Sequence, residues 1–162
     1  MYSMAIEMLD IPSISAIIAA SGVLVGVVLA YLEVRSLVET RRTDLVISLY
    51  RDFGGKDFQE AWQKVMSSEY EDYNDYVAKY GLDEAYQVVM LFEGIGTLLH
   101  MKLIDIALVQ HLISGPIVST WEKMEPIIKA HRQKLNQPQF CEWFEYLYKE
   151  VQKREQQLEK IQ

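Results

Sequence analysis

The sequence predicts an all-α protein, with one N-terminal transmembrane helix that continues into a cytoplasmic stem and is followed by a bundle of about five helices. Residues 11–32 contain no charged side chain. After them, apolar residues recur at spacings of three and four, which is typical of helices with one buried face. Only eight glycines and four prolines occur in 162 residues, and no segment alternates as a strand does.

Residues 11–32 form the predicted transmembrane helix. At a rise of about 1.5 Å per residue, 22 residues cover roughly 33 Å, enough for a hydrocarbon core of about 30 Å. Glu7 and Asp10 precede this stretch without any Lys or Arg, which disfavours a signal peptide. A buried core helix is the other alternative, but such helices rarely run this long without a charge.

The charges around the span predict its orientation. No basic residue precedes it, whereas Arg35, Arg41 and Arg42 follow it closely. Positive residues favour the cytoplasmic side, so residues 1–10 are expected outside the cell membrane and the rest of the chain in the cytoplasm. The three arginines are also expected to contact lipid headgroups.

A stripe of small residues lies within the span. Gly22, Gly26 and Ala30 recur every fourth residue, so they share one face where a second helix can approach closely. We expect association of transmembrane helices at this stripe, although such a stripe also arises by chance. The span has no ionisable side chain, which excludes a charged transport pathway through it.

The apolar pattern predicts a stem over 33–53 and a helical domain over 56–162. Gly54 and Gly55 are expected to end the stem. The second helix is expected to begin at a capping box of Asp57 and Glu60, and the third to cover 69–80 before Gly81. Asp83 and Asp105 are expected to cap the next two helices, the first of them central to the bundle. The last two helices are expected to begin at Pro116 and near Pro138, with a bend or break at Pro126.

Net charge and cysteine content exclude several classes of protein. The formal charge of −7 argues against a nucleic-acid partner, and the lone Cys141 cannot form an internal disulfide. Eight acids and only two lysines lie in residues 57–84. Within this segment the sequence predicts a surface for a partner protein, although tyrosines at helical spacing also occur in cores. The predicted surface consists of Glu69, Tyr70, Glu71, Asp72, Tyr73, Asp75 and Tyr76.

No motif predicts a catalytic, metal or cofactor site. His100, His111 and His131 fall on different predicted helices, and none has a ligand-like spacing to another histidine. Glu93 and His100, seven residues apart on one face, are the one pair considered for coordination or proton sharing. The acids of residues 69–75 do not form a calcium-binding loop, because this segment lacks the glycine and the final glutamate of such a loop.

Two glycine pairs and the cysteine are also expected to be structural. The Gly-Gly-Lys segment at residues 54–56 is too short for a phosphate-binding loop. Gly94 and Gly96 are expected to form a notch where another helix packs closely. The acidic and aromatic neighbours of Cys141 are expected to raise its pKa, which disfavours a nucleophile.

Sparse apolar motifs along nearly the whole chain resemble those of an uncharacterised bacterial and archaeal family of membrane-anchored helical proteins, known only as a domain of unknown function. The resemblance implies a fold and no activity. The residues that carry it are Leu91, Phe92, Glu93, Gly94, Ile95, Gly96, Leu103, Ile104, Asp105, Trp121, Pro126, Ile128, Arg132, Pro138, Phe144 and Leu147.

These observations favour a non-enzymatic, single-pass module that acts by helix–helix association and docking. Its expected partners are the lipid bilayer and either further copies of the chain or a membrane protein. Three alternatives stay open: an oligomeric pore or ion channel, an accessory subunit of a larger membrane complex, and an enzyme with a histidine and carboxylate site in the bundle.

Overall fold

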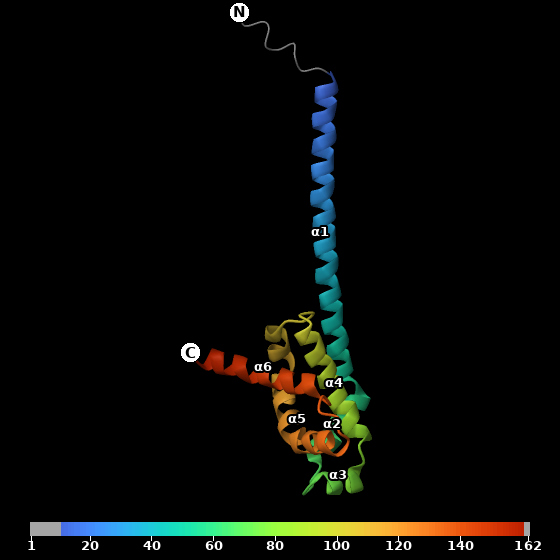
Figure 1. Ribbon diagram of the computed structural model, residues 1–162, viewed down its shortest axis with the longest axis vertical. Coiled ribbons are helices and arrows are strands. Elements are labelled where there is room, and N and C mark those ends of the chain that lie inside the picture. The colour runs from blue at the N-terminus through green and yellow to red at the C-terminus, as the bar shows by residue number, and fades with distance from the viewer. Residues whose placement is uncertain (1–10, 161–162) are drawn as a thin grey trace, which may run out of the picture. The chain divides into compact units, whose positions relative to one another are not determined.

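The computed structural model describes residues 11–160, and their side chains except at 11–14, 38–43 and 46. Within this range all regular structure is helical, which confirms the predicted all-α fold with a long apolar N-terminal helix and a following bundle. The predicted N-terminal tail, 1–10, lies outside the described residues. The helices are α1 (Ile11–Gly54), α2 (Lys56–Ser67), α3 (Tyr73–Tyr80), α4 (Asp83–His100), α5 (Ile106–Lys134) and α6 (Glu142–Glu159), as Figure 1 shows.

The chain divides into two compact units, residues 1–43 and 44–162. The described part of the first unit is the N-terminal part of α1. The second unit, which we call the helical domain, contains the last residues of α1 together with α2 to α6. Leu49 and Phe53, which were expected in the stem, pack against the core of the helical domain.

Helix α4 is the centre of the helical domain, as predicted. It packs most extensively against α6 and also against α2, while α5 contacts both α6 and α3. Aromatic rings fill the junction: Phe92 stacks on Phe144 with centroids 4.9 Å apart, and Trp121 meets Phe144 edge-on at 5.1 Å. Burial of such large rings is the main stabilising contribution in a core of this kind.

Three helix starts differ from the prediction. Asp57 and Glu60 form no capping box, because α2 begins at Lys56 after Gly55, and Asp57 lies within the first turn. Helix α3 begins at Tyr73 rather than at residue 69, since the Asp72 carboxylate accepts a hydrogen bond from the Asp75 backbone N–H at 2.9 Å. Asp83 is the first residue of α4 and not its cap.

Two other predicted ends are confirmed. Gly81 follows α3 with a φ of 72°, a conformation that suits glycine. Asp105 caps α5 by accepting a hydrogen bond from the Ala107 N–H. Both residues act on backbone groups within four positions of themselves, which explains why the sequence indicates them.

Helix α5 contains two helices joined at a kink, close to the break that was expected before Pro116. Ile113 has non-helical angles, with φ −145° and ψ 20°. Pro116, three residues later, lacks the N–H that would donate to the carbonyl of Leu112, which favours a break at this turn. Pro126 lies inside α5 without non-helical angles there, so the expected split at Pro126 is wrong.

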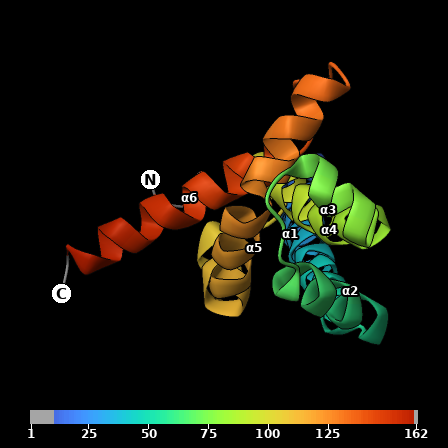
Figure 2. The ribbon, with the colours of Figure 1, turned by 90° about the horizontal axis from the view of Figure 1, so that it is seen from below.

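Helix α6 begins at Glu142, four residues later than Pro138. Cys141 precedes it in a left-handed conformation, with φ 56°. Residues 137–141 form turns instead of the expected first turn of this helix. The C-terminal half of α6 extends away from the other helices of the domain in both Figure 1 and Figure 2.

Candidate functional site

An apolar stretch of α1, Ser15–Leu37, is long and apolar enough to cross a membrane. Its 23 residues cover about 35 Å as a helix. None of this surface is buried inside the protein, and its large apolar side chains are exposed. The Ser21 hydroxyl donates to the Ile17 carbonyl at 2.8 Å, so this polar group is satisfied within the helix.

The structure places Gly22, Gly26 and Ala30 on this exposed surface. A methyl group added at Gly22 or Gly26 would meet nothing within 4 Å, so no described part of the chain fills the stripe. Arg35 is exposed near the end of the stretch. Arg41 and Arg42 lie in α1, but their side chains are outside the described ones.

The predicted tyrosine and acid surface is wrong at Tyr76. Tyr76 is 1% exposed and packs edge-on against Tyr70, so it belongs to the core and offers no surface to a partner. The Tyr70 hydroxyl donates to the Lys123 carbonyl, and Tyr73 contacts His131. The tyrosine spacing therefore reflects packing of α3 and the preceding turn on the helical domain.

The acidic side chains of this segment bind mostly to groups of the same segment. Asp72 caps α3, and the Asp75 carboxylate lies 2.8 Å from Lys79 Nζ and accepts from the Glu71 N–H at 3.0 Å. Lys79 holds the pKa of Asp75 below its ordinary value, with help from the Glu71 N–H. Glu69 and Glu71 remain exposed.

His131 is buried in a polar pocket of the core. Its Nδ1 lies 3.1 Å from the Tyr73 hydroxyl and its Nε2 lies 3.0 Å from the Tyr86 hydroxyl. A neutral imidazole has one donor and one acceptor, so the two tyrosines satisfy both nitrogens and leave none for a metal. Burial lowers the pKa of His131.

The other histidines are held apart from His131. His100 packs on Trp143 with ring centroids 4.1 Å apart, and His111 Nδ1 lies 2.6 Å from the Ala107 carbonyl. No group of three histidine, cysteine or acidic side chains in the described part of the chain is arranged to hold a metal ion.

Glu93 acts at the junction of α4 and α6. Its Oε2 accepts a hydrogen bond from the Phe144 N–H at 2.7 Å, which satisfies a donor in the first turn of α6. Burial raises the pKa of Glu93, although the Phe144 and Trp143 N–H groups oppose that rise. Glu93 therefore caps a helix, and the structure gives it no bond to His100.

Gly96 and Arg132 complete this junction. A methyl group at Gly96 would lie 2.0 Å from the Trp143 carbonyl oxygen, which confirms the predicted close-packing notch. Gly94 meets nothing within 4 Å, so the notch is at Gly96 alone. Arg132 Nε donates to the Phe140 carbonyl at 2.7 Å, its Nη2 to the Cys141 carbonyl at 3.2 Å, and its Nη1 to Glu145 at 2.7 Å.

Cys141 lies inside the same junction. Its thiol is buried, and burial together with Glu93 raises the pKa of Cys141 to about 12. A thiol with so high a pKa is a poor nucleophile. The junction is therefore structural. The sequence indicates its notch at Gly96 but not the bond between Glu93 and Phe144, which are 51 residues apart.

An apolar groove crosses the helical domain between the end of α1 and the first half of α5. Leu108, Leu112 and Tyr50 form its exposed edges, and Ile95 and Ile113 lie deeper. No pattern in the sequence predicts this groove. The full lining is Leu49, Tyr50, Phe53, Ile95, Ile104, Leu108, Val109, Leu112 and Ile113.

One family model matches the chain, over residues 16–151, and is described as a domain of unknown function (DUF4760). The match covers the apolar stretch of α1 from its second residue and continues to the middle of α6. No curated protein and no solved structure matches the chain.

Proposed function

We propose that this chain, which belongs to the DUF4760 family of domains of unknown function, is a single-pass membrane-tethered docking module without enzymatic activity. The observation that carries the proposal is the apolar stretch Ser15–Leu37, which nothing in the described structure covers. Such a surface is stable in lipid and unfavourable in water.

Three features support a permanent span. The stretch has no charged side chain before Glu33, so insertion meets no charge penalty over most of its length. The family match begins at residue 16, so the stretch is part of the matched domain instead of preceding it as a removable leader would. The helix continues beyond the stretch to Gly54 without a break.

The arginines after the span support a cytoplasmic helical domain. Arg35 lies near the end of the stretch and Arg41 and Arg42 follow it, whereas no Lys or Arg precedes it. In this topology residues 1–10 lie outside the cell membrane and 44–162 in the cytoplasm.

Within the membrane, the stripe of Gly22, Gly26 and Ala30 supports association of spans. These residues let two helix backbones approach closely, which favours packing without any polar group. Tethering in a plane raises the effective concentration of the helical domains, so weak contacts between neighbours suffice. The expected partners are further copies of this chain or another membrane protein.

The mass of the full chain solubilised in mild detergent tests association at the stripe. Changing Gly22→Leu and Gly26→Leu together is expected to reduce the particle to one chain per micelle. Val28→Leu, which lies on the opposite side of the helix, is the control and is expected to leave the mass unchanged. An unchanged mass in the glycine variant would refute this contact.

A second measurement addresses the topology. Thiol reagents that do not cross membranes are added to sealed cells that express Ser3→Cys or Lys160→Cys, and the unchanged chain with its buried Cys141 gives the background. Labelling at residue 3 but not at residue 160 is expected. The reverse pattern would contradict the proposed orientation.

A further inference from the structure

An exposed apolar surface lies at the connection between α4 and α5. Met101 and Leu103 are exposed in the connection, Met101 by 61%, and Leu108 and Leu112 are exposed on α5. Leu108 and Leu112 line the groove together with Tyr50, so the surface continues onto α1. We call these five residues the apolar end surface. Contiguous exposed apolar residues of this kind mark a contact surface.

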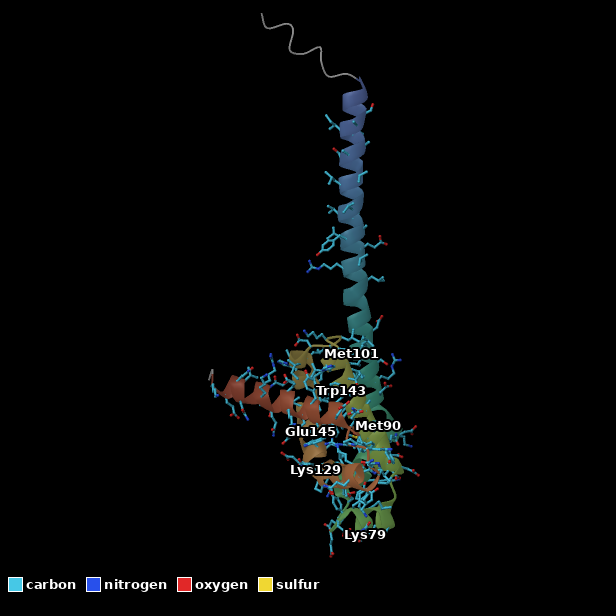
Figure 3. The ribbon with its side chains drawn as sticks, in the orientation of Figure 1. Lys79, Met90, Met101, Lys129, Trp143 and Glu145 are labelled. Atoms are coloured by element: carbon cyan, nitrogen blue, oxygen red, sulfur yellow. The ribbon has the colours of Figure 1, made fainter. Side chains whose placement is uncertain are left out.

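The segment that carries most of this surface has few charges. Residues 94–121 contain only two charged side chains, Lys102 and Asp105, and Asp105 accepts the hydrogen bond that caps α5. Of the eight acids of residues 57–84, Asp83 and Glu84 form the first turn of α4 at its other end, and Asp75 pairs with Lys79. Helix α4 is 18 residues or about 27 Å long. Figure 3 shows Met101 and Lys79 at opposite ends of the helical domain. The apolar end surface is therefore on the end that an anionic bilayer repels least.

The chain also enters the helical domain at this end. Phe53 meets Phe92 at 6.4 Å between centroids, and Leu49 lines the groove with Ile95. Helices α1 and α4 are thus antiparallel within the domain, and the residues of α1 before Leu49 run toward the α4–α5 connection. Six residues lie between Leu37, the end of the apolar stretch, and Asp44, where the domain begins, so seven Cα–Cα steps join the two. Even fully extended, they reach at most about 25 Å.

We propose that the apolar end surface inserts into the headgroup and upper acyl region of the bilayer that holds the span. The proposal rests on the proposed function, because it takes residues 15–37 to lie in that bilayer. Lys102 is exposed at the tip between Met101 and Leu103, where its ammonium group reaches lipid phosphates while its neighbours enter the apolar layer. With this contact, the chain binds the bilayer at two places, the span and the apolar end surface.

The experiment uses the full chain in lipid nanodiscs that hold one copy each. An environment-sensitive fluorophore is attached at Met101→Cys or Leu103→Cys, and quenching is measured with lipids that carry nitroxides at known depths. Met90→Cys is the matched control, because Met90 is also an exposed methionine of the same domain, 42% exposed, and lies away from the end surface (Figure 3). Val25→Cys reports on the span. The native thiol of Cys141 is buried, so labelling of the unchanged chain measures the background.

At residues 101 and 103 we expect a blue-shifted emission and strong quenching by nitroxides that lie about 5–10 Å below the membrane surface. At residue 90 we expect neither effect. Quenching at residue 25 without quenching at 101 and 103 would overturn this inference and leave the proposed function standing. No quenching at residue 25 would overturn both. A blue shift at 101 that appears only in discs holding two copies would identify a second chain as the occupant and would also overturn the inference.

Discussion

The carboxylate of Glu93 accepts a hydrogen bond from the backbone N–H of Phe144 at 2.7 Å, so a side chain of α4 caps helix α6. The cap joins two helices that are distant in sequence. It lies beside the notch at Gly96 and the carbonyls held by Arg132, and together these contacts fix where α6 crosses α4.

Removing the cap is expected to destabilise the helical domain. Glu93→Ala leaves the Phe144 N–H without its partner and should lower the free energy of unfolding by about 0.5–2 kcal/mol. Denaturation of the full chain in micelles, followed by tryptophan fluorescence, measures this. Glu150→Ala, which removes only a 3.8 Å ion pair with the exposed Lys153, is the control and should change stability by less than about 0.5 kcal/mol. Equal effects of the two variants would show that the cap is unimportant.

Gly96 and Gly94 form a matched pair for testing the notch. In Gly96→Ala the new methyl group meets the Trp143 carbonyl, a backbone atom that cannot rotate away, so a loss of about 1–3 kcal/mol or more is expected. Gly94→Ala adds a methyl group in open space and should stabilise the helix by about 0.5–1 kcal/mol. Thermal unfolding of both variants gives the comparison. A tolerated alanine at residue 96 would contradict the close approach of α4 and α6.

Arg132 should not be replaceable by lysine. Its guanidinium donates to two backbone carbonyls and to Glu145, and a single ammonium group cannot reach all three. We expect Arg132→Lys to cost about 1.5–3 kcal/mol of unfolding free energy. Lys149→Ala removes the exposed ion pair of the same glutamate and should cost less than about 1 kcal/mol. If lysine at 132 preserved full stability, the carbonyl contacts would contribute nothing.

His131 should make stability depend on pH. Because burial lowers its pKa, the unfolded chain binds a proton more readily than the folded chain. The stability that neutral His131 contributes is present above the ordinary value of 6.5 and is lost as the pH falls through the lower folded pKa. The free energy of unfolding should therefore fall on acidification in this range, and the fall should be shallower in His131→Gln. Parallel pH profiles of the two chains would be evidence against this role.

The sequence predicted features that depend on local composition. The uncharged run in α1, the glycine that ends α3 and the Asp105 cap all act within a few residues of themselves. The expected capping roles of Asp57 and Asp83 failed because both residues lie inside the first turns of their helices. Which acid caps a helix depends on backbone angles at one residue, and composition does not determine these angles.

Features that depend on long-range packing were not predictable. Tyr76 has the same helical spacing as Tyr73, yet it is buried between Tyr70 and Tyr80, because α3 packs on the domain along that face. The groove beside Tyr50 exists only once α1 and α5 are brought together. Sequence periodicity shows that a face is apolar and does not show which element covers it.

The central claim is that lipid surrounds residues 15–37. A spin label placed in turn at each of these positions in the reconstituted full chain tests it most directly. We predict that collisions with oxygen rise and collisions with a water-soluble nickel chelate fall toward the middle of the stretch, near Gly26. Equal access of the nickel chelate to all positions would show that water or protein surrounds the stretch and would contradict the account.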